Sequence, residues 1–456
     1  MLKEAIKTSI FDLFKIGPGP SSSHTIGPMK AAYDFLQRAN LMTDLTDNQQ
    51  VMIHLYGSLS ATGKGHGTDR AVIAGLLGWL PETCDPNEFT TLLKNEDDIY
   101  LIKIQEKQIS IHAKNIVFEK GRYDSPHPNT LVFKLLSDHK IILEEEYYSV
   151  GGGFIQRKGE NLQAQNDKTP TFEFSTMKEF KEHLLKNKMT LTDLMIANEM
   201  SLTGLSRRAI YQKIDDVLEA MNKAVKRGLR HKGILPGTIK LRRKAPILYN
   251  QAKSLASASD SFMIFLNAYC MAASEENAAG SIVVTAPTSG ASGVIPGIFF
   301  LLRNHYHYDK QKLREGMLAA AAVGFLIKHN ASISGAEMGC MGEIGSASAM
   351  AAAMLSYCAG KSIETVEAAA EIAIEHHLGM TCDPIGGYVQ IPCIERNAMG
   401  AIKAYNAYLL ASSGNTAHQK ISLDSVIKVM RATGKDMSKK YKETSQAGLA
   451  LSATEC

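Results

Sequence analysis

Residues 158–171 read KGENLQAQNDKTPT, and this polar stretch divides the chain into two parts of different character. Its Asn, Gln, Lys and Thr residues and its single proline predict a linker, which we place at 158–177. The chain has 456 residues, too many for one simple core, so two or three domains are expected. We therefore predict an N-terminal domain over 1–157 and a C-terminal domain over 178–456.

The N-terminal part mixes helical segments with short runs of alternating β-branched residues. Helical spacing of apolar residues predicts helices over Met29–Leu36 and Arg70–Leu80. Turn residues separate the strand-like runs, which favours an α+β domain with a mostly antiparallel sheet. The expected strands are Val51–Leu55, Tyr100–Ile104, Gln108–Ala113, Asn115–Phe118, Thr130–Leu136 and Ile141–Ser149.

The C-terminal part loses this alternation and becomes rich in Ala, Met and Leu. Its many Ala and Gly residues indicate helices that pack very closely, with few bulky side chains between them. We therefore predict a mostly all-α domain. The expected helices are Leu191–Met200, Ser206–Lys226, Asp260–Ala273, Gln311–Lys328, Ser346–Cys358 and Ile363–His376.

Charge and hydropathy narrow the class of protein. Fifty basic and 46 acidic residues give a net charge of +4, which argues against nucleic acid as the main partner. The basic stretches 223–232 and 240–244 are interpreted as solvated faces. No secretory signal is visible in residues 1–14. The longest apolar run, Gly316–Ile327, is shorter than the roughly 20 residues of a membrane span. A cytoplasmic protein without a membrane segment is expected.

The glycine-rich stretch 17–28 reads GPGPSSSHTIGP, and its Pro28 suits the first turn of a helix. Hydroxyls and backbone N–H groups at a helix start can hold a carboxylate or phosphate. It is not a Walker A loop, because no Gly-Lys-Ser/Thr follows at the right spacing. The alternative is an elaborate helix cap. His24 beside the three serines favours a site.

A second stretch, 62–69, reads TGKGHGTD and is interpreted as a glycine loop that presents Lys64 and His66 together. A nucleotide-binding loop is the competing interpretation, although glycine follows Lys64. Thr68 and Asp69 could serve as the N-cap of the next helix. Glycine-rich order is entropically costly, so a purely structural role is not favoured.

Two further glycine stretches leave their roles open. Residues 285–293, TAPTSGASG, fit a plain turn and a substrate seat about equally well. Residues 149–154, SVGGGF, could be mistaken for the phosphate loop of a pyridoxal-phosphate enzyme. Because this stretch follows a strand at an expected domain edge, a flexible hinge is at least as consistent with it.

The cysteines give the sharpest chemical signal. Seven in a long chain expected in the cytosol do not form a disulfide framework. Cys340 lies among glycines in SGAEMGCMGEIGS, and Cys382 and Cys393 share a loop rich in Pro and Gly. Thiolates in such loops are typical iron–sulfur ligands, whereas the short Cys-x₂–₄-Cys knuckle of zinc sites is absent. Ordinary buried or surface roles are expected for Cys84, Cys270 and Cys358.

Together these motifs resemble the bacterial iron–sulfur L-serine dehydratases, in the single-chain form that fuses β and α parts. SSSHTIGP, YGSLSATGKGHGTD and HPNT carry the resemblance in the β part. APTSGASG, SGAEMGCMGEIGSA, HHLGMTCDPIGG and PCIERNA carry it in the α part. Ser289 stands where we expect Asn in relatives, which leaves the role of that residue open. The resemblance covers essentially the whole chain.

The resemblance implies a [4Fe–4S] cluster on Cys340, Cys382 and Cys393, and conversion of L-serine to pyruvate and ammonia. It also implies that the N-terminal domain is similar to the substrate-regulated domain of some phosphoglycerate dehydrogenases. Three cysteines leave one iron unclaimed, so the last residue, Cys456, is expected to ligate it in the resting enzyme. An open iron could then act as a Lewis acid on the serine hydroxyl.

Histidine titrates near neutral pH, so His24 and His66 are the candidates for proton transfer, with Lys64 as an alternative base or carboxylate partner. A homodimer is expected. The rival functions are a pyridoxal-phosphate serine dehydratase and a cluster-bearing redox sensor or electron carrier. The expected substrate-binding residues are Ser21, Ser22, Ser23, Thr25, Thr288, Ser289 and Gly290.

Overall fold

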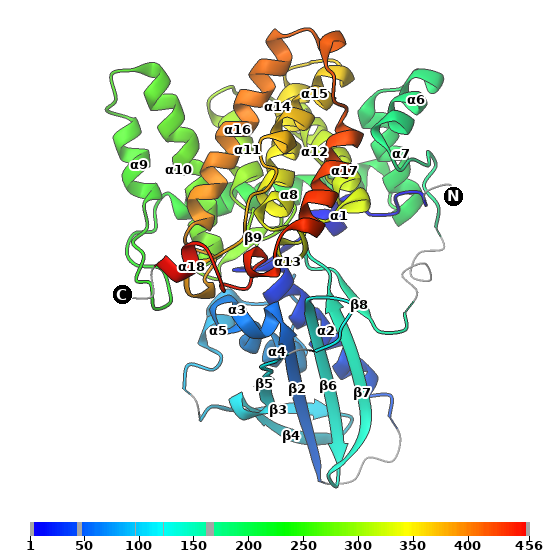
Figure 1. Ribbon diagram of the computed structural model, residues 1–456, viewed down its shortest axis with the longest axis vertical. Helices are drawn as coiled ribbons and strands as arrows, with labels where there is room; N and C mark the ends of the chain where they lie inside the picture. The colour runs from blue at the N-terminus through cyan, green and yellow to red at the C-terminus, as the bar shows by residue number, and fades with distance from the viewer. Residues whose placement is uncertain (1–3, 43–47, 96, 122, 161–167, 453–456) are drawn as a thin grey trace.

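The computed structural model describes residues 4–42, 48–95, 97–121, 123–160 and 168–452. A region of strands and helices is followed by a mostly helical region, which confirms the expected fold class (Figure 1). In Figure 1 the helical region lies above the sheet. Among the described residues, no helix is both long enough and apolar enough to cross a membrane.

The main sheet has the strand order β5-β2-β6-β7-β8, and a separate hairpin pairs β3 with β4. Only the β2–β5 pair of the main sheet is parallel, so the sheet is mostly antiparallel, as predicted. Each expected strand is present, with both ends within two residues of the prediction. The strands are β2 Gln49–Gly57, β3 Ile99–Ile104, β4 Lys107–His112, β5 Ile116–Phe118, β6 Asn129–Ser137, β7 Lys140–Ser149 and β8 Ile155–Arg157.

Helices cover one face of this sheet. The buried side chains between these helices and the sheet form a hydrophobic core that is separate from the core of the helical region. The helices of this region are α2 Gly27–Ala39, α3 Ser58–His66, α4 Thr68–Leu76 and α5 Pro86–Thr91. Phe133 of β6 stacks on Phe35 of α2 at 5.1 Å between ring centroids and meets Tyr147 of β7 edge-on at 5.7 Å. Large buried aromatic rings of this kind dominate the energy of packing, and they fix α2 on the sheet.

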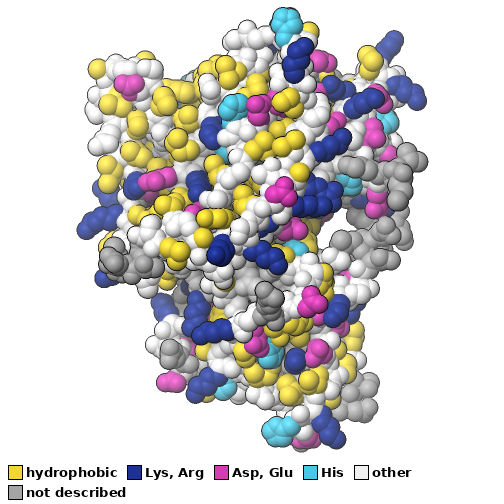
Figure 2. Space-filling model, viewed as in Figure 1, with side chains coloured by type: hydrophobic (Ala, Val, Ile, Leu, Met, Phe, Trp, Pro, Cys, Tyr) yellow, Lys and Arg dark blue, Asp and Glu magenta, His cyan; other side chains and the backbone are white. Residues whose placement is uncertain are grey.

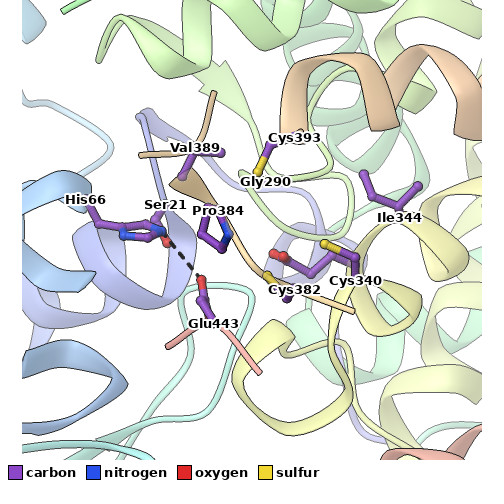
Figure 3. Close-up of a pocket in the computed structure, with 11 residues that line it drawn as sticks. Ser21, His66, Gly290, Cys340, Ile344, Cys382, Pro384, Val389, Cys393 and Glu443 are labelled. Atoms are coloured by element: carbon purple, nitrogen blue, oxygen red, sulfur yellow. Dashed lines mark ion pairs between the residues drawn. The ribbon is translucent and has the colours of Figure 1, made fainter. Parts of the chain in front are cut away.

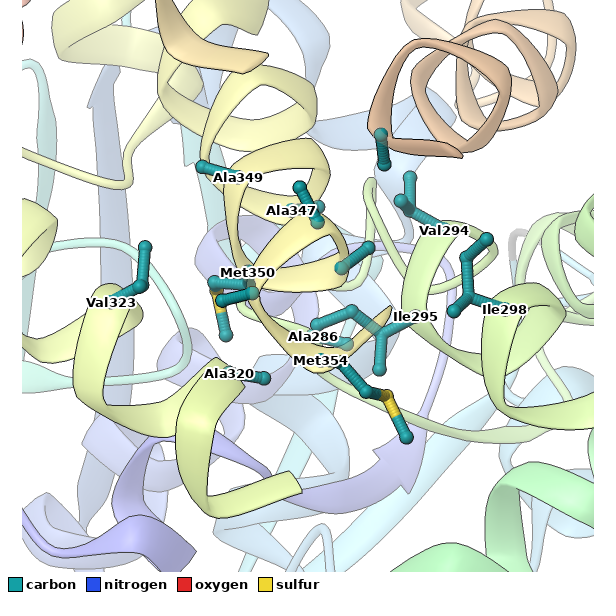
Figure 4. Packing of buried hydrophobic residues seen from close by; sticks show 14 of the residues in the cluster. Ala286, Val294, Ile295, Ile298, Ala320, Val323, Ala347, Ala349, Met350 and Met354 are labelled. Atoms are coloured by element: carbon teal, nitrogen blue, oxygen red, sulfur yellow. The ribbon is translucent and has the colours of Figure 1, made fainter. Parts of the chain in front are cut away.

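The helical region is one bundle built on small side chains. Helices α12 and α14 pack through Ala320, Val323, Ala347 and Met350, all fully or nearly fully buried (Figure 4). Alanine lets helix backbones approach closely, as the composition predicts. The longer helices are α6 Met177–Asn187, α7 Leu191–Thr203, α8 Arg207–Gly228, α9 Ala245–Ala252, α10 Ala258–Ala278, α11 Val294–Asn304, α12 Lys310–Asn330, α14 Ser346–Cys358, α15 Ile363–Glu375, α16 Cys393–Ser413 and α17 Leu423–Asp436.

The chain begins inside the helical region before it enters the sheet. Short helix α1, Ile10–Leu13, belongs to the hydrophobic core of the helical bundle. Strand β1, Ile16–Pro18, pairs with β9, Ile282–Val284, and Asn277 donates a hydrogen bond to the Pro20 carbonyl at 2.7 Å. The serine-rich stretch that follows therefore lies at the junction of the two regions. The expected domain boundaries at 157 and 177 stay predictions.

The prediction of a glycine loop over 62–69 is wrong, because α3 runs through Thr62 to His66. Gly67, in the left-handed conformation at φ +67°, joins α3 to α4 and takes the N-cap position considered for Thr68 or Asp69. The glycines serve close packing instead. A Cβ on Gly65 would lie 2.6 Å from the Gly387 carbonyl oxygen, so only glycine lets α3 approach this turn of the helical region.

Residues 149–154 form a tight buried turn, which argues against both a flexible hinge and a phosphate loop. Gly151, Gly152 and Gly153 are buried and all have positive φ. A Cβ on Gly151 would lie 3.0 Å from the Ser334 Cβ, so the turn packs directly on the loop that precedes Cys340. The glycines allow this backbone path and this close approach.

Candidate functional site

A small cavity of about 10 Å³ lies at the junction of the two regions (Figure 3). The sheet region contributes Ser21 and His66, and the helical region contributes the sulfur atoms. Figure 3 shows His66 and Ser21 on one side and the cysteines on the other. The lining residues are Ser21, His66, Gly290, Cys340, Glu343, Ile344, Cys382, Pro384, Val389, Cys393 and Glu443.

Three separate backbone segments bring the predicted cysteines to this cavity. Cys340 follows the short helix α13 Gly335–Met338, Cys382 lies in the loop after α15, and Cys393 is the first residue of α16. One ligand atom each of Cys340, Cys382 and Glu343 lie within 4.8 Å of one another. Cys84, Cys270 and Cys358 are buried elsewhere and do not line this cavity.

A half-buried arginine, Arg396, which the sequence analysis missed, lies against the thiol group of Cys340. Nη1 of Arg396 lies 3.3 Å from the Cys340 sulfur and 2.7 Å from the Thr381 carbonyl oxygen, and Nη2 donates to Asp383 at 3.2 Å. A hydrogen bond from the Cys382 thiol and the charge of Arg396 lower the pKa of Cys340. Three thiols beside one cation match the donor chemistry of a thiolate-ligated iron–sulfur cluster. The sequence feature that could have pointed to Arg396 is its position within the motif PCIERNA.

The two predicted histidines meet at the opposite side of the cavity. His24 lies in a π-helical turn, Ser22–Ile26, and His66 ends α3, with ring centroids 4.5 Å apart. Thr25 Oγ1 donates to the His66 carbonyl at 2.8 Å, and Thr68 Oγ1 donates to the His24 carbonyl at 2.7 Å. These reciprocal hydrogen bonds tie the serine-rich turn to the end of α3.

Local hydrogen bonds set the protonation of His66. Its Nδ1 lies 2.9 Å from the Thr62 carbonyl oxygen, which can only accept, so Nδ1 carries the hydrogen and Nε2 keeps its lone pair. Burial lowers the pKa of His66 to about 4. Burial, and then the nearby His66, lower the pKa of His24 well below its usual value. Both rings are therefore neutral near pH 7.

Glu443 completes the site, and no local sequence signal pointed to it. Its Oε1 lies 3.6 Å from His24 Nδ1 and 3.6 Å from His66 Nε2. Its backbone N–H donates to the Cys382 carbonyl at 2.8 Å, and its φ of +57° is rare for a non-glycine residue. Burial, and then the charge of Glu343, raise the pKa of Glu443 well above its usual value. Glu443 therefore links the cysteine loop to the histidine pair.

The predicted substrate-binding residues lie around the same cavity, although only Ser21 and Gly290 line it. Ser23 Oγ is 2.9 Å from His24 Nδ1, and the Ser289 N–H donates to Ser22 Oγ at 3.3 Å. Thr288 Oγ1 donates to Glu343 Oε1 at 2.7 Å, whereas Thr25 binds the His66 carbonyl. The stretch 285–293 thus faces the serine-rich turn.

The structure does not bring Lys64 into this group. Its side chain is exposed, with Nζ 5.7 Å from the Phe118 ring centroid. Residues two apart on a helix do not face the same side, so Lys64 points away when His66 faces the cavity. This placement gives no support to the predicted role of Lys64.

Cys456 lies outside the described residues, so its predicted role as a ligand is not tested. The described part of the tail docks on the loop that carries Cys382. Ser445 Oγ donates to the Pro384 carbonyl at 2.6 Å, and the Leu449 N–H donates to Asp383 Oδ2 at 2.8 Å.

Comparison with known protein families matches both halves of the chain. The model of the serine dehydratase alpha chain matches residues 186–450, and that of the serine dehydratase beta chain matches residues 9–160. The chain belongs to the serine dehydratase family. The cavity lies between the two family regions, because the beta-chain region supplies Ser21 and His66 to its lining and the alpha-chain region supplies the cysteines and Glu443.

Curated relatives match this serine dehydratase chain over nearly its whole length. The L-serine dehydratase of Streptomyces coelicolor is 42% identical, over 98% of this chain and 99% of the relative. L-serine dehydratase 2 of Escherichia coli is 40% identical, over 98% of this chain and 99% of the relative. The L-serine dehydratase of Helicobacter pylori strain 26695 is 40% identical, over 97% of this chain and 98% of the relative.

Proposed function

We propose that this chain converts L-serine to pyruvate and ammonia, with a [4Fe–4S] cluster held by Cys340, Cys382 and Cys393. The observation that carries the proposal is one cavity in which three thiols face a neutral histidine base. Relatives named as L-serine dehydratases support the substrate. The thiol donors and the adjacent Arg396 support the cluster.

Residues on different sides of the cavity take different roles in the proposed reaction. When bound, the cluster would supply Lewis acidity that eases loss of the serine hydroxyl. His66 Nε2, which keeps its lone pair, takes the Cα proton, and His24 lies beside it to relay protons. Ser21 lines the cavity and contacts the substrate, and the hydroxyls of Ser22, Ser23, Thr288 and Ser289 lie behind it and hold the neighbouring groups in place. The aminoacrylate product of elimination becomes an imine and hydrolyses to pyruvate and ammonia.

The proposal includes Cys456 as the ligand of the fourth iron in the resting enzyme, where serine displaces it. The docked tail supports this idea, because Ser445 and Leu449 are held beside Pro384 and Asp383. A tethered thiol has a high local concentration at such a site. Cys456→Ser should therefore bind serine more tightly and lose its cluster faster in air. Wild-type values for both quantities would contradict the idea.

The decisive experiment is anaerobic incubation of the iron-reconstituted chain with L-serine, followed by detection of pyruvate. A pyridoxal-phosphate enzyme needs a lysine amine at its reacting centre, and the described residues that line this cavity include no lysine. Borohydride should therefore leave activity intact. A redox carrier would form no pyruvate, so absence of pyruvate from fully reconstituted protein would overturn the dehydratase proposal.

We propose a homodimer as the working assembly. Figure 2 shows apolar side chains gathered over α9, α10 and α16, where Ile247, Met263, Met399 and Leu410 are exposed. Exposed apolar patches rimmed by polar residues mark interaction surfaces. Light scattering should give twice the chain mass, and Met399→Glu should shift it toward one chain. The expected cytoplasmic location stays a prediction.

A further inference from the structure

Three ligand atoms converge between the two halves of the cavity without a hydrogen bond from either histidine to the carboxylate. His24 Nδ1, His66 Nε2 and Glu443 Oε1 all lie within 4.8 Å of one another, and all three residues are buried. Each histidine nitrogen is 3.6 Å from Oε1, beyond the 2.7–3.2 Å of a hydrogen bond. Zinc–nitrogen and zinc–oxygen distances of about 2.0–2.2 Å at a tetrahedral angle separate neighbouring ligands by about 3.4 Å.

The hydrogen-bond partners leave both histidines with a lone pair on the side that faces Glu443. His66 Nδ1 donates to Thr62, which leaves Nε2 free. Ser58 Oγ gives its hydrogen to the Glu443 carbonyl at 2.5 Å, so it must accept from His24 Nε2 at 3.1 Å. His24 Nδ1 is therefore the unprotonated nitrogen, and it accepts from Ser23 Oγ.

Ser23 does not block this nitrogen permanently. Its hydroxyl hydrogen can rotate toward Ser21 Oγ, 3.3 Å away, which frees His24 Nδ1. Two imidazole lone pairs and a carboxylate oxygen repel one another unless a positive charge lies between them. A proton on Glu443 relieves the charge but leaves both 3.6 Å gaps unbridged, whereas a metal ion would bridge them.

The surrounding contacts are those of a metal site with an oriented outer shell. Metal-binding histidines donate their other ring nitrogen to a carbonyl or a similar acceptor, as His66 does to Thr62 and His24 does to Ser58. Two histidines and one glutamate are a known ligand set for Zn²⁺ with an open fourth position. Here the fourth position opens toward the cavity that His66 and Glu443 line.

We propose that His24 Nδ1, His66 Nε2 and Glu443 Oε1 form a binding site for Zn²⁺, separate from the three thiols. Metal binding at this site does not depend on the proposed dehydratase activity. Its consequence does rest on that proposal: bound zinc occupies the lone pair of His66 that accepts the substrate proton. Zinc is therefore an inhibitor that competes with serine.

The test measures zinc directly in the full chain, prepared anaerobically with its iron content determined. Zinc-edge X-ray absorption at saturating Zn²⁺ should show a nitrogen/oxygen shell at about 2.0–2.1 Å, distinct from a sulfur shell at about 2.3 Å. Glu443→Gln and His66→Gln should each lose one zinc equivalent and that nitrogen/oxygen shell, with any sulfur shell unchanged. Their affinity should fall at least about 100-fold, and that of Ser58→Ala by about 10–100-fold.

His377→Gln is the matched control, because His377 is another buried histidine and lies outside this cavity. It should keep the wild-type zinc stoichiometry. If zinc bound to the wild-type protein shows only sulfur ligands, the proposal is overturned. This measurement uses the wild-type protein alone, so it does not depend on whether a variant folds. Wild-type zinc content in both Glu443→Gln and His66→Gln overturns it as well. Failure of pyruvate formation would refute the dehydratase proposal while leaving this measurement intact.

Discussion

Replacing Gly65 by alanine should damage catalysis without unfolding the protein. Gly65 is the residue before His66 in α3, and its Cα faces the turn at Gly386–Gly387, which lies between Cys382 and Cys393 in sequence. An added Cβ would lie 2.6 Å from the Gly387 carbonyl oxygen and 3.0 Å from the Gly386 carbonyl oxygen. Both neighbours are backbone atoms, which cannot rotate out of the way.

The magnitude follows from these distances. Ordinary contact begins at 3.4 Å, so α3 and the turn must separate by about 0.8 Å. Helix propensity gains about 1 kcal/mol from Gly→Ala, whereas overpacking costs about 1–3 kcal/mol, so the net loss of stability is at most about 2 kcal/mol. A displacement near 1 Å at a reacting group can cost about 100-fold in rate. We therefore expect kcat/KM to fall by about 100-fold.

The assay is anaerobic pyruvate formation, combined with thermal unfolding and iron analysis of the same samples. Gly63→Ala is the control, because it gives the same helix the same propensity gain. Its Cβ would lie 3.0 Å from Phe118 Cε1 and 3.2 Å from Thr68 Oγ1, side-chain atoms that need to move by only a few tenths of an ångström, so activity should fall far less than in Gly65→Ala. A folded Gly65→Ala protein with full iron and kcat/KM within about twofold of the wild type would refute the reasoning.

Four further predictions test other parts of the structure. Cys340→Ala, Cys382→Ala and Cys393→Ala should each lose the cluster by iron and sulfide analysis, whereas Cys84→Ala, Cys270→Ala and Cys358→Ala should keep it. His66→Ala should lower kcat about 10²–10⁴-fold with an unchanged cluster spectrum. Burial lowers the pKa of His377 to about 4, so the unfolded chain binds the extra proton between pH 6.5 and 4. Unfolding free energy should fall there by up to about 1.4 kcal/mol per pH unit, and denaturant titrations should show a flatter profile for His377→Gln. Phe133→Ala should cost about 3–5 kcal/mol in the same titrations.

Local patterns were sufficient to predict the strands of the sheet other than β8 and six of the longer helices of the bundle, whereas α6, α9, α11, α16 and α17 were not among the expected helices. The helix expected over 346–358 has those bounds in the structure, because its alanines favour helix and a turn ends it at Gly360. The strands of the sheet follow from alternating β-branched residues. The glycines of Thr62–Gly67 led to the wrong prediction of a loop where the structure has helix α3. Glycine lowers helix propensity, but close contact with Gly387 requires it at position 65, and tertiary packing overrides local preference.

The site itself could be predicted only in part. Cys340, Cys382 and Cys393 were found because thiols in glycine and proline loops are chemically unusual. Glu343 and Arg396 lay within quoted motifs and were passed over, although a charge in a small apolar run is itself a signal. Glu443 had no such signal. Its role depends on a backbone contact with Cys382, 61 residues away, and on histidines about 400 residues away.

The cavity is built from both family regions. His66, the proposed proton acceptor, belongs to the beta-chain region, whereas every described thiol of the cavity belongs to the alpha-chain region. Neither region alone contains both the proposed base and the proposed cluster ligands. Proton transfer needs hydrogen-bond distances, so the interface must hold its register to a fraction of an ångström. The packing of Gly65 on Gly387, the Ser289–Ser22 hydrogen bond and the Ser58–Glu443 hydrogen bond all cross this interface. Because each of them ends beside a residue of the proposed site, we expect any ligand that moves the sheet region against the helical bundle to change the geometry of that site as well.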